Sequence, residues 1–292
     1  MRFATIEYKG KTFVGSVDKA SQSVTPLVMR DGAPVSDLME VIRNQARFAS
    51  LYAAGGEAIA LSALKLRAPL VPVRNIMCVG KNYREHAKEF TASGFDSSAS
   101  SAADAIPTAP IIFTKVPQSV IGPDEPIVYP TGVSEQLDYE AELAVVIGKG
   151  GRGIPLKSTM EHVWGYTIIN DVTARDLQAK HKQWFLGKSM DTFAPMGPWC
   201  VTADEVDLAS AGIKCWVNGE LRQDAKFTDL IFDVPTLIST ISAGISLVPG
   251  DIIATGTPAG VGIGFKPPRF LSKGDVISME VDGIGRLTNP VR

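Results

Sequence analysis

The chain has 292 residues, of which 45% are hydrophobic and 21% charged, and its formal net charge is −2. This is the composition of an ordinary folded protein with a sizeable core, and the lack of a basic excess argues against a nucleic-acid partner. No apolar run approaches the roughly 18 residues of a membrane span, and the N-terminus lacks a signal-peptide pattern. The three scattered cysteines favour a reducing, cytoplasmic location.

The first 70 residues predict a small accessory domain. Alternating side chains on either side of Lys9-Gly10-Lys11 indicate a β-hairpin, and two short helices are expected to follow. These elements are predicted over residues 2–8, 12–17, Asp37–Gln45 and Glu57–Leu66. Prolines 69 and 72 precede a change of pattern, so we place a boundary there, between residues 1–70 and a larger domain over 71–292.

From Ile76 onward the pattern is rich in strands. Short apolar runs between Gly and Pro turns predict strands at Ile76–Val79, Ile111–Thr114, Ile127–Tyr129, 137–147, Tyr166–Asn170, Lys214–Val217, Asp251–Ala254 and Val276–Val281. The best helix candidates are Tyr83–Phe90, Ala174–His181 and Val234–Ser242. Many strands with few helices indicate the α+β class and not a βαβ repeat.

The predicted strand 137–147 carries acidic residues on one face. Side chains in a strand alternate between faces, so Asp138, Glu140 and Glu142 share one side. A solvated strand face is the plain interpretation of this pattern. Next to a core, however, neighbouring carboxylates repel each other, and a divalent cation would relieve that repulsion.

Asp171 is a candidate third partner for Glu140 and Glu142. It lies where the strand ending at Asn170 passes into a helix, and alone it would be explained as a helix N-terminal acid. Taken together, the three residues offer only oxygen ligands, with no paired His or Cys. Such a set favours a hard ion, Mg²⁺ or alternatively Mn²⁺ or Ca²⁺.

His86 and Glu89 are three residues apart on the predicted helix Tyr83–Phe90, so their side chains can touch. A carboxylate beside an imidazole orients the ring and raises its basicity, which suits a general base acting on water. A surface helix with mixed charges is the alternative. Of the other histidines, His162 is interpreted as structural, and His181 ends the helix after Asp171.

Other segments can contact an anionic ligand. Lys115 and Lys188 are candidate cations for a substrate carboxylate, although most lysines are merely solvated. In Pro249–Gly264 a strand enters a Gly-rich turn, where backbone N–H groups and Thr257 can approach an anion; tight-turn glycines are the alternative. Gly148–Gly153 has the glycine spacing of a dinucleotide site, but a proline two residues later leaves too little helix for a pyrophosphate.

With these residues in place, the chain resembles the fumarylacetoacetate hydrolase (FAH) superfamily over about residues 74–292. The similar stretches are Val79–Glu89, Leu137–Gly148, Asn170–Gln178, Lys188–Pro198 and Thr255–Gly262. Two further segments, His181–Lys188 and Lys266–Leu271, are similar to those of the subgroup of FAH-domain-containing proteins.

The resemblance implies a mixed β-sandwich roll and a homodimer. It implies Mg²⁺ or Mn²⁺ held by the three acids and a catalytic dyad on a lid that orders over substrate. The residues it assigns are Glu140, Glu142 and Asp171 for the metal, His86 and Glu89 for the dyad, Lys188 and Thr257 near the substrate carboxylate, and Arg175 and Gln178 near the site. The segment Ser93–Pro110 departs from the family pattern and is expected to alter substrate choice.

The sequence therefore predicts a metal-dependent enzyme for small 2-oxo acids. The leading hypothesis is hydrolysis of a C–C bond in a 2,4-dioxo acid of the acylpyruvate or fumarylpyruvate type, as in aromatic catabolism, through a chelated enolate. Two alternatives use the same site, namely decarboxylation and keto–enol tautomerisation of oxaloacetate-like acids. A non-catalytic organic-acid-binding protein is a further alternative of a different class.

Overall fold

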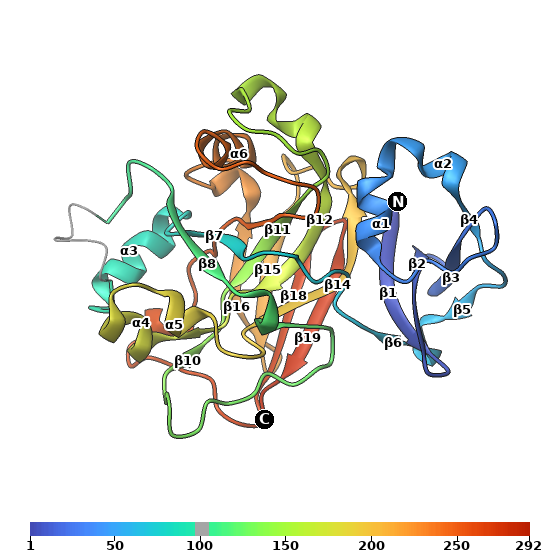
Figure 1. The fold of residues 1–292 in the computed structure, drawn as a ribbon. Coiled ribbons are helices and arrows are strands. Elements are labelled where there is room, and N and C mark those ends of the chain that lie inside the picture. The colour runs from blue at the N-terminus through green and yellow to red at the C-terminus, as the bar shows by residue number, and fades with distance from the viewer. Residues whose placement is uncertain (97–104) are drawn as a thin grey trace.

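The structure is a computed structural model that describes residues 1–96 and 105–292. Its N-terminal part contains the strands β1 (Arg2–Tyr8), β2 (Lys11–Asp18), β3 (Ser23–Met29), β4 (Tyr52–Ala54), β5 (Ile59–Ala60) and β6 (Lys65–Leu66), with the helices α1 (Leu38–Arg43) and α2 (Phe48–Leu51). These elements form one end of the molecule (Figure 1).

The rest of the chain is also dominated by strands. Its strands are β7 (Ile76–Gly80), β8 (Ile111–Lys115), β9 (Val120–Ile121), β10 (Leu137–Asp138), β11 (Ala141–Ile147), β12 (Val163–Asn170), β13 (Thr173–Ala174), β14 (Ala194–Thr202), β15 (Gly212–Val217), β16 (Glu220–Lys226), β17 (Ile252–Ala254), β18 (Val276–Val281) and β19 (Gly285–Pro290). Its α-helices are α3 (Arg84–Ala92), α4 (Arg175–His181), α5 (Phe185–Lys188) and α6 (Val234–Ser242).

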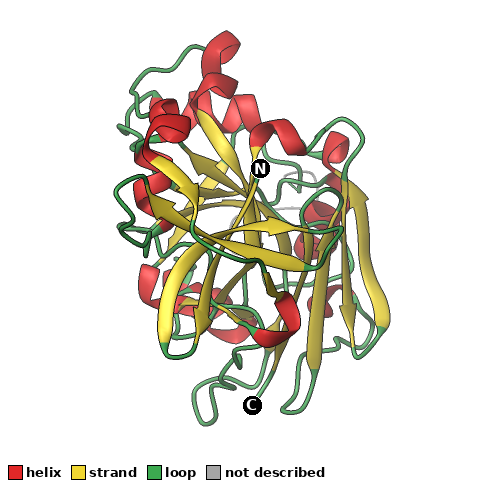
Figure 2. Ribbon diagram, turned by 90° about the vertical axis from the view of Figure 1, so that its right-hand side faces the viewer, coloured by secondary structure: helices red, strands yellow, loops and turns green. Residues whose placement is uncertain are grey.

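A large mixed sheet runs through the molecule in the order β4-β3-β2-β1-β14-β12-β11-β17-β7-β8. A second, four-stranded sheet has the order β16-β15-β18-β19 and lies against it, so the strands form the layers visible in Figure 2. The α+β, strand-rich fold class predicted from the sequence is confirmed.

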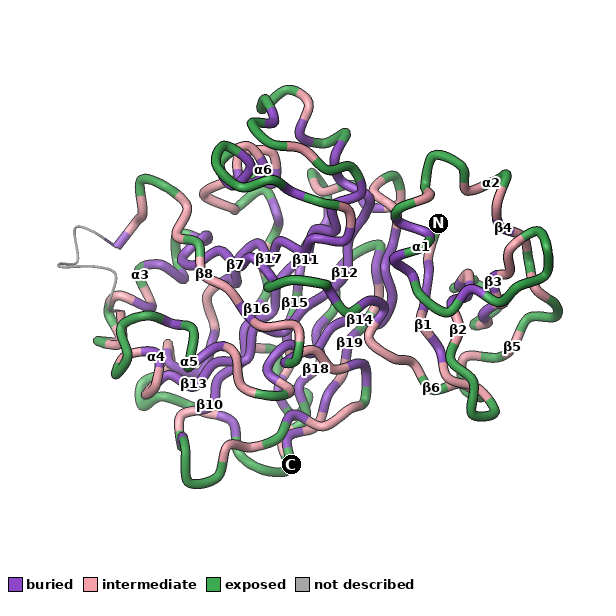
Figure 3. The backbone as a smooth tube through the Cα atoms, in the orientation of Figure 1, coloured by how far each residue is buried: buried purple, intermediate pink, exposed green. Residues whose placement is uncertain are grey.

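The centre of the large sheet is buried on both faces. Leu143 and Val145 of β11 pack into a core shared with the four-stranded sheet, for example with Cys215. Ala144 and Val146, which point the other way, belong to a second core that includes α1. Figure 3 shows the resulting buried centre around β11, β12 and β17. A strand covered on both faces needs the continuous apolar run that this segment has.

The N-terminal part joins the large sheet directly. β1 pairs antiparallel with β14, with Phe3 opposite Cys200, and α1 packs on the same core as β11. An N-cap explains where α1 begins, because the Asp37 carboxylate accepts a hydrogen bond from the Met39 N–H at 2.9 Å. The division into domains at residue 70 stays a prediction.

Three expected elements differ from the structure. The helix predicted over Glu57–Leu66 is wrong, because β5 and β6 there pair with β3 and β1, and these edge pairings override a helix-favouring composition. Ile127–Tyr129 forms only an isolated bridge from Ile127 to Val291. The predicted strand 137–147 is interrupted, since β10 pairs with β13 while β11 belongs to the large sheet.

The segment Ser93–Pro110 falls partly on residues 97–104, which lie outside the described residues, so its effect on substrate choice stays a prediction.

Among the described residues, no helix is both long and apolar enough to cross a membrane.

Candidate active site

Strand order explains why the site residues meet. β11 runs antiparallel to β12 and β17, and β17 runs parallel to β7. The start of β11 therefore lies beside the ends of the other three strands. Each end leads into a predicted site segment: β7 toward α3, β12 into Asp171, and β17 into the Gly-rich turn, residues 255–264. The sheet thus gathers at one edge segments that are far apart in sequence.

The three predicted metal ligands come together at this edge. Glu140, Glu142 and Asp171 each offer one carboxylate oxygen, and the three oxygens lie within 4.8 Å of one another. Their backbone is tied together as well, because the Asp171 N–H donates to the Glu140 carbonyl at 2.9 Å. All three residues are buried, Glu142 at 1% exposure, so the solvated strand face is excluded.

Three buried cations surround these carboxylates. Lys188 Nζ lies 2.8 Å from both Glu140 Oε2 and Asp171 Oδ2. Lys115 Nζ lies 2.6 Å from Asp171 Oδ1, and it also donates to the Val172 carbonyl at 3.0 Å. Arg175 Nη2 lies 2.7 Å from Glu140 Oε1. Buried charges of this kind persist only when they are paired, so the acids and the cations stabilise each other.

The balance of charge differs between the acids. Burial raises the pKa of Glu140, but Lys188 and Arg175 outweigh it and lower this pKa to about 2. Burial, together with the neighbouring Asp171 and Glu140, raises the pKa of Glu142 well above its ordinary value. Glu142 Oε2 receives a hydrogen bond from the Gly256 N–H at 2.8 Å. Three buried carboxylates, one of them with its pKa raised by burial and by its like-charged neighbours, fit a hard divalent cation.

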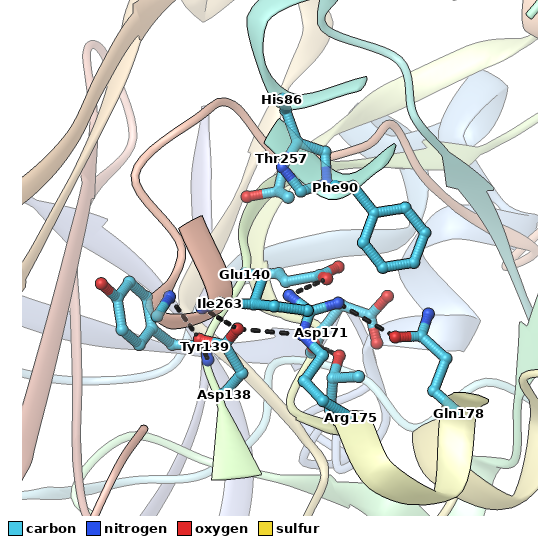
Figure 4. A network of polar contacts seen from close by, with 12 residues as sticks. His86, Phe90, Asp138, Tyr139, Glu140, Asp171, Arg175, Gln178, Thr257 and Ile263 are labelled. Carbon is cyan, nitrogen blue, oxygen red and sulfur yellow. Dashed lines mark hydrogen bonds and ion pairs between the residues drawn. The ribbon is translucent and has the colours of Figure 1, made fainter. Parts of the chain in front are cut away.

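The dyad residues contact each other on α3. His86 Nδ1 lies 3.3 Å from Glu89 Oε2, and the Gly260 N–H donates to Glu89 Oε1 at 3.1 Å. His86 is buried, and its ring stacks on Phe90 with centroids 6.1 Å apart. In Figure 4, His86 and Thr257 lie on one side of Glu140, and Arg175 and Gln178 on the other.

A second contact restrains the chain around α3. Lys81 Nζ lies 2.7 Å from Asp96 Oδ2, and both side chains are 2% exposed. Lys81 comes directly after β7, whereas Asp96 follows the end of α3, so the ion pair spans the segment that carries the dyad. Thr91 Oγ1 also donates to Asp96 at 2.6 Å.

One cavity contains most of the predicted residues. It is lined by Val79, Gly80, Lys81, His86, Phe90, Phe113, Glu140, Glu142, Arg175, Gln178, Trp184, Lys188 and Thr257. Thr257 is held by Gln223, whose Nε2 donates to Thr257 Oγ1 at 2.7 Å. His181 is exposed and does not line this cavity, while His162 contacts the Lys149 carbonyl, as a structural residue would.

The Gly-rich turn does bind anions, but these are the protein's own carboxylates. Its N–H groups at Gly256, Gly260 and Gly262 donate to Glu142, Glu89 and Asp138 respectively. Gly256 and Gly260 have φ of 98° and 102°, a region that strongly favours glycine. From the sequence, Asp138 is expected to have a supporting or structural role, and no role is predicted for Lys81. Asp138 is visible in the sequence only as one acid of the strand face and Lys81 only as part of a similar stretch, because the partners of both are distant in sequence.

Comparison with known proteins gives the class to which this site belongs. Residues 75–292 match the family described as fumarylacetoacetate (FAA) hydrolase C-terminal. This match covers most of the chain, and the chain therefore belongs to that family. Members of the family use a divalent metal, consistent with the carboxylates gathered here.

Particular relatives extend this likeness to the whole chain. The chain is 43% identical over 310 residues to the oxaloacetate tautomerase YisK of Bacillus subtilis, with 100% of each chain covered. It is 42% identical to the human mitochondrial oxaloacetate tautomerase FAHD2A, over 77% of this chain and 68% of that one. A solved fumarylacetoacetate hydrolase from Exiguobacterium antarcticum has a TM-score of 0.84 at 40% identity, covering 100% of this chain and 99% of that one.

Proposed function

We propose that this protein is a divalent-metal-dependent enzyme that interconverts the keto and enol forms of oxaloacetate or a similar small 2-oxo acid. The carrying observation is one cavity lined by the Glu140 and Glu142 carboxylates and the His86 imidazole, with an Asp171 carboxylate oxygen within 4.8 Å of those of the two glutamates. The likeness to oxaloacetate tautomerases, one of them over the full chain, favours this reaction over the hydrolysis that the sequence alone placed first.

The assignment of residues follows from their contacts. Glu140, Glu142 and Asp171 would hold Mg²⁺ or Mn²⁺, which when bound would polarise the substrate's 2-oxo group and favour its enol character. Lys188 and Arg175 supply buried positive charge next to these acids, where a substrate carboxylate must also lie. Thr257 and Gln178 line the same cavity and can donate hydrogen bonds to a substrate bound in it.

His86 is the proposed proton carrier. Its Nδ1 faces Glu89, which leaves Nε2 to exchange a proton with the substrate. In the keto-to-enol direction one proton leaves C3 and one arrives at the C2 oxygen, so the reaction is balanced without water or a redox partner. A base of this kind contributes roughly 10²–10⁴-fold to a proton transfer.

Hydrolysis of a 2,4-dioxo acid is the second candidate. A dyad such as His86 and Glu89 can equally activate a water molecule, and the similar structure from Exiguobacterium antarcticum is described as a fumarylacetoacetate hydrolase. Decarboxylation would use the same cations and acids. A purely binding function does not explain why an imidazole is oriented by a carboxylate inside the cavity.

An absorbance assay separates these candidates. Enol-rich oxaloacetate is mixed with the purified protein and Mg²⁺, and the decay of the enol band is followed alongside the appearance of pyruvate. We expect rapid enol decay without pyruvate, and loss of this activity in chelator. Pyruvate formation would indicate the decarboxylase. Cleavage of acylpyruvate in heavy-oxygen water, with the label in the acid product, would indicate the hydrolase.

A homodimer and a cytoplasmic location are also part of the proposal, with small 2-oxo acids as the partners. The family resemblance supports the dimer, and the scattered buried cysteines support a reducing compartment. Sedimentation at micromolar concentration tests the dimer, and a single monomer peak would contradict it.

A further inference from the structure

Asp138 is a buried carboxylate for which the proposed reaction has no role. It is 0% exposed, and hydrogen bonds reach both of its oxygens. Oδ1 accepts from the N–H groups of Tyr139 and Gly262 at 2.9 and 2.7 Å. Oδ2 accepts from the Ile263 N–H at 3.0 Å and from Arg175 Nε at 2.9 Å. A carboxylate with this many donors has one fixed orientation.

One branch of these contacts leads to the carboxylate cluster. The pairing of β10 with β13 places Arg175 beside Asp138, because the Arg175 N–H donates to the Gln136 carbonyl at 2.9 Å. With its Nε on Asp138, the guanidinium reaches Glu140 through Nη2 at 2.7 Å and Gln178 through Nη1 at 3.1 Å. Asp138 thus sets the direction in which Arg175 meets Glu140 (Figure 4).

The other branch leads to the dyad. Asp138 holds the Gly-rich turn at Gly262 and Ile263, and the same turn holds Glu89 through Gly260. The fit is close: a Cβ at Gly262 would lie 2.7 Å from Asp138 Oδ1. The position of Glu89, and through it that of His86, therefore depends on a turn that Asp138 fixes.

We infer that Asp138 is a positioning residue for both groups of active-site residues. It positions the carboxylate cluster through Arg175 and the dyad of His86 and Glu89 through the Gly-rich turn. The inference concerns how the site is held. Its activity readout rests on the proposed function, whereas its amide-exchange readout does not.

The test compares Asp138→Asn with two variants that each disturb one branch. Arg175→Lys keeps the charge but cannot reach Asp138, Glu140 and Gln178 together, so it disturbs the Arg175 branch. Gly262→Ala introduces the clashing Cβ and disturbs the turn branch. Asp251→Asn is the matched control, because Asp251 is also buried and accepts from Arg74 at 2.6 Å and from the Val248 N–H at 2.8 Å, without contacting the cavity residues.

Amide hydrogen exchange of residues 84–92 and 258–265 is the first readout. Asp138→Asn and Gly262→Ala should speed exchange there by about tenfold or more, because local opening becomes easier, whereas Arg175→Lys and Asp251→Asn should not. In the tautomerase assay, Asp138→Asn should lower kcat by roughly 10–100-fold, as for residues that orient catalytic groups, with KM changed less than about threefold.

The inference is overturned if Asp138→Asn leaves exchange in residues 84–92 unchanged, since the turn branch would then be absent. It is equally overturned if Asp138→Asn and Asp251→Asn give the same profile, because Asp138 would then contribute stability alone. If Asp138→Asn does not fold, Gly262→Ala decides: unchanged exchange at α3 overturns the inference. If neither the wild type nor any variant shows tautomerase activity, the proposed function is wrong. The amide-exchange measurement still tests the positioning role of Asp138 in that case.

Discussion

The two sides of the active site are built differently. The carboxylate side lies on the ends of buried strands, where Glu140, Glu142 and Asp171 are fixed by sheet pairing and by buried cations. The dyad side lies on α3, which packs through a small apolar cluster of Phe90, Trp184, Val261 and Ile263 and through a few polar contacts. The sheet gives the acids a rigid frame, whereas the dyad depends on contacts that single substitutions can remove.

The largest effect is expected on the carboxylate side. Glu142→Ala removes one of three oxygen donors, and turnover should fall by roughly 10³-fold or more, because both substrate polarisation and charge stabilisation are lost. Calorimetry should show weakened Mg²⁺ binding in parallel. Normal turnover with weakened Mg²⁺ binding would show that these acids do not hold a functional metal.

A comparable but more selective effect is expected on the dyad side. His86→Gln should lower kcat by roughly 10²–10⁴-fold through loss of proton transfer, while the dissociation constant for Mg²⁺ changes less than about threefold. A fall in kcat without a change in the dissociation constant for Mg²⁺ would show that the dyad acts in proton transfer and not in metal binding. A matching loss of metal affinity would mean that the two sides are not independent.

The ion pair that spans α3 should affect stability more than chemistry. Lys81→Met removes the ammonium from the buried Lys81–Asp96 ion pair and should lower the free energy of unfolding by about 1–3 kcal/mol. The double variant Lys81→Met, Asp96→Asn should recover part of this loss, because the buried charge is gone as well. Denaturant melts of Lys81→Met, Asp96→Asn and the double variant measure the free energy of unfolding, and additive losses would contradict the coupling.

The pH dependence of the stability of the metal-free protein is a further test of the carboxylate side, with a smaller expected effect. Because the pKa of Glu142 is raised in the folded state above its ordinary 4.5, the folded protein retains a proton that the unfolded chain releases, so stability should fall as the pH rises above about 4.5. Glu140, with a pKa lowered to about 2, acts in the opposite sense, and its contribution is lost as the pH falls from 4.5 toward 2.

Thermal melts in chelator from pH 5 to 8 check this, with Glu142→Gln as the comparison. The variant should lose the decline toward high pH, and saturating Mg²⁺ should remove it from the wild type. An identical decline in wild type and variant would show that Glu142 does not cause it.

The smallest effect is expected for the exposed pair of Lys88 and Glu85 on the outer side of α3. Its atoms lie 2.8 Å apart, but both side chains are more than half exposed, so solvent screens the attraction. Lys88→Ala should leave kcat and the melting temperature within experimental error. A marked loss of activity would mean that the outer face of α3 also contributes to the site.

Much of the site could be predicted because its signals are local in sequence. The alternation around Glu140 and Glu142 and the spacing of His86 and Glu89 each lie within one short segment, and strand 163–170 leads directly into Asp171. The assembly of these segments at one sheet edge came from the family resemblance, since strand order cannot be deduced from periodicity.

What could not be predicted depends on distant partners. The helix expected over Glu57–Leu66 failed because edge pairing with β1 and β3 outweighs local propensity. The break between β10 and β11 follows from the pairing of Leu137 with Ala174. In the sequence Asp138 is one more acid on a strand face, and the role proposed for it depends on its contacts with Arg175, Gly262 and Ile263, which are distant in sequence.

The most direct test of the central claim is an NMR measurement of deuterium exchange at C3 of oxaloacetate. The wild-type protein with Mg²⁺ should speed this exchange without forming pyruvate, chelator should abolish the acceleration, and His86→Gln should bind Mg²⁺ without accelerating exchange. Acceleration that persists in chelator, or that survives in His86→Gln, would contradict the account of acids that hold a metal and an imidazole that moves the proton.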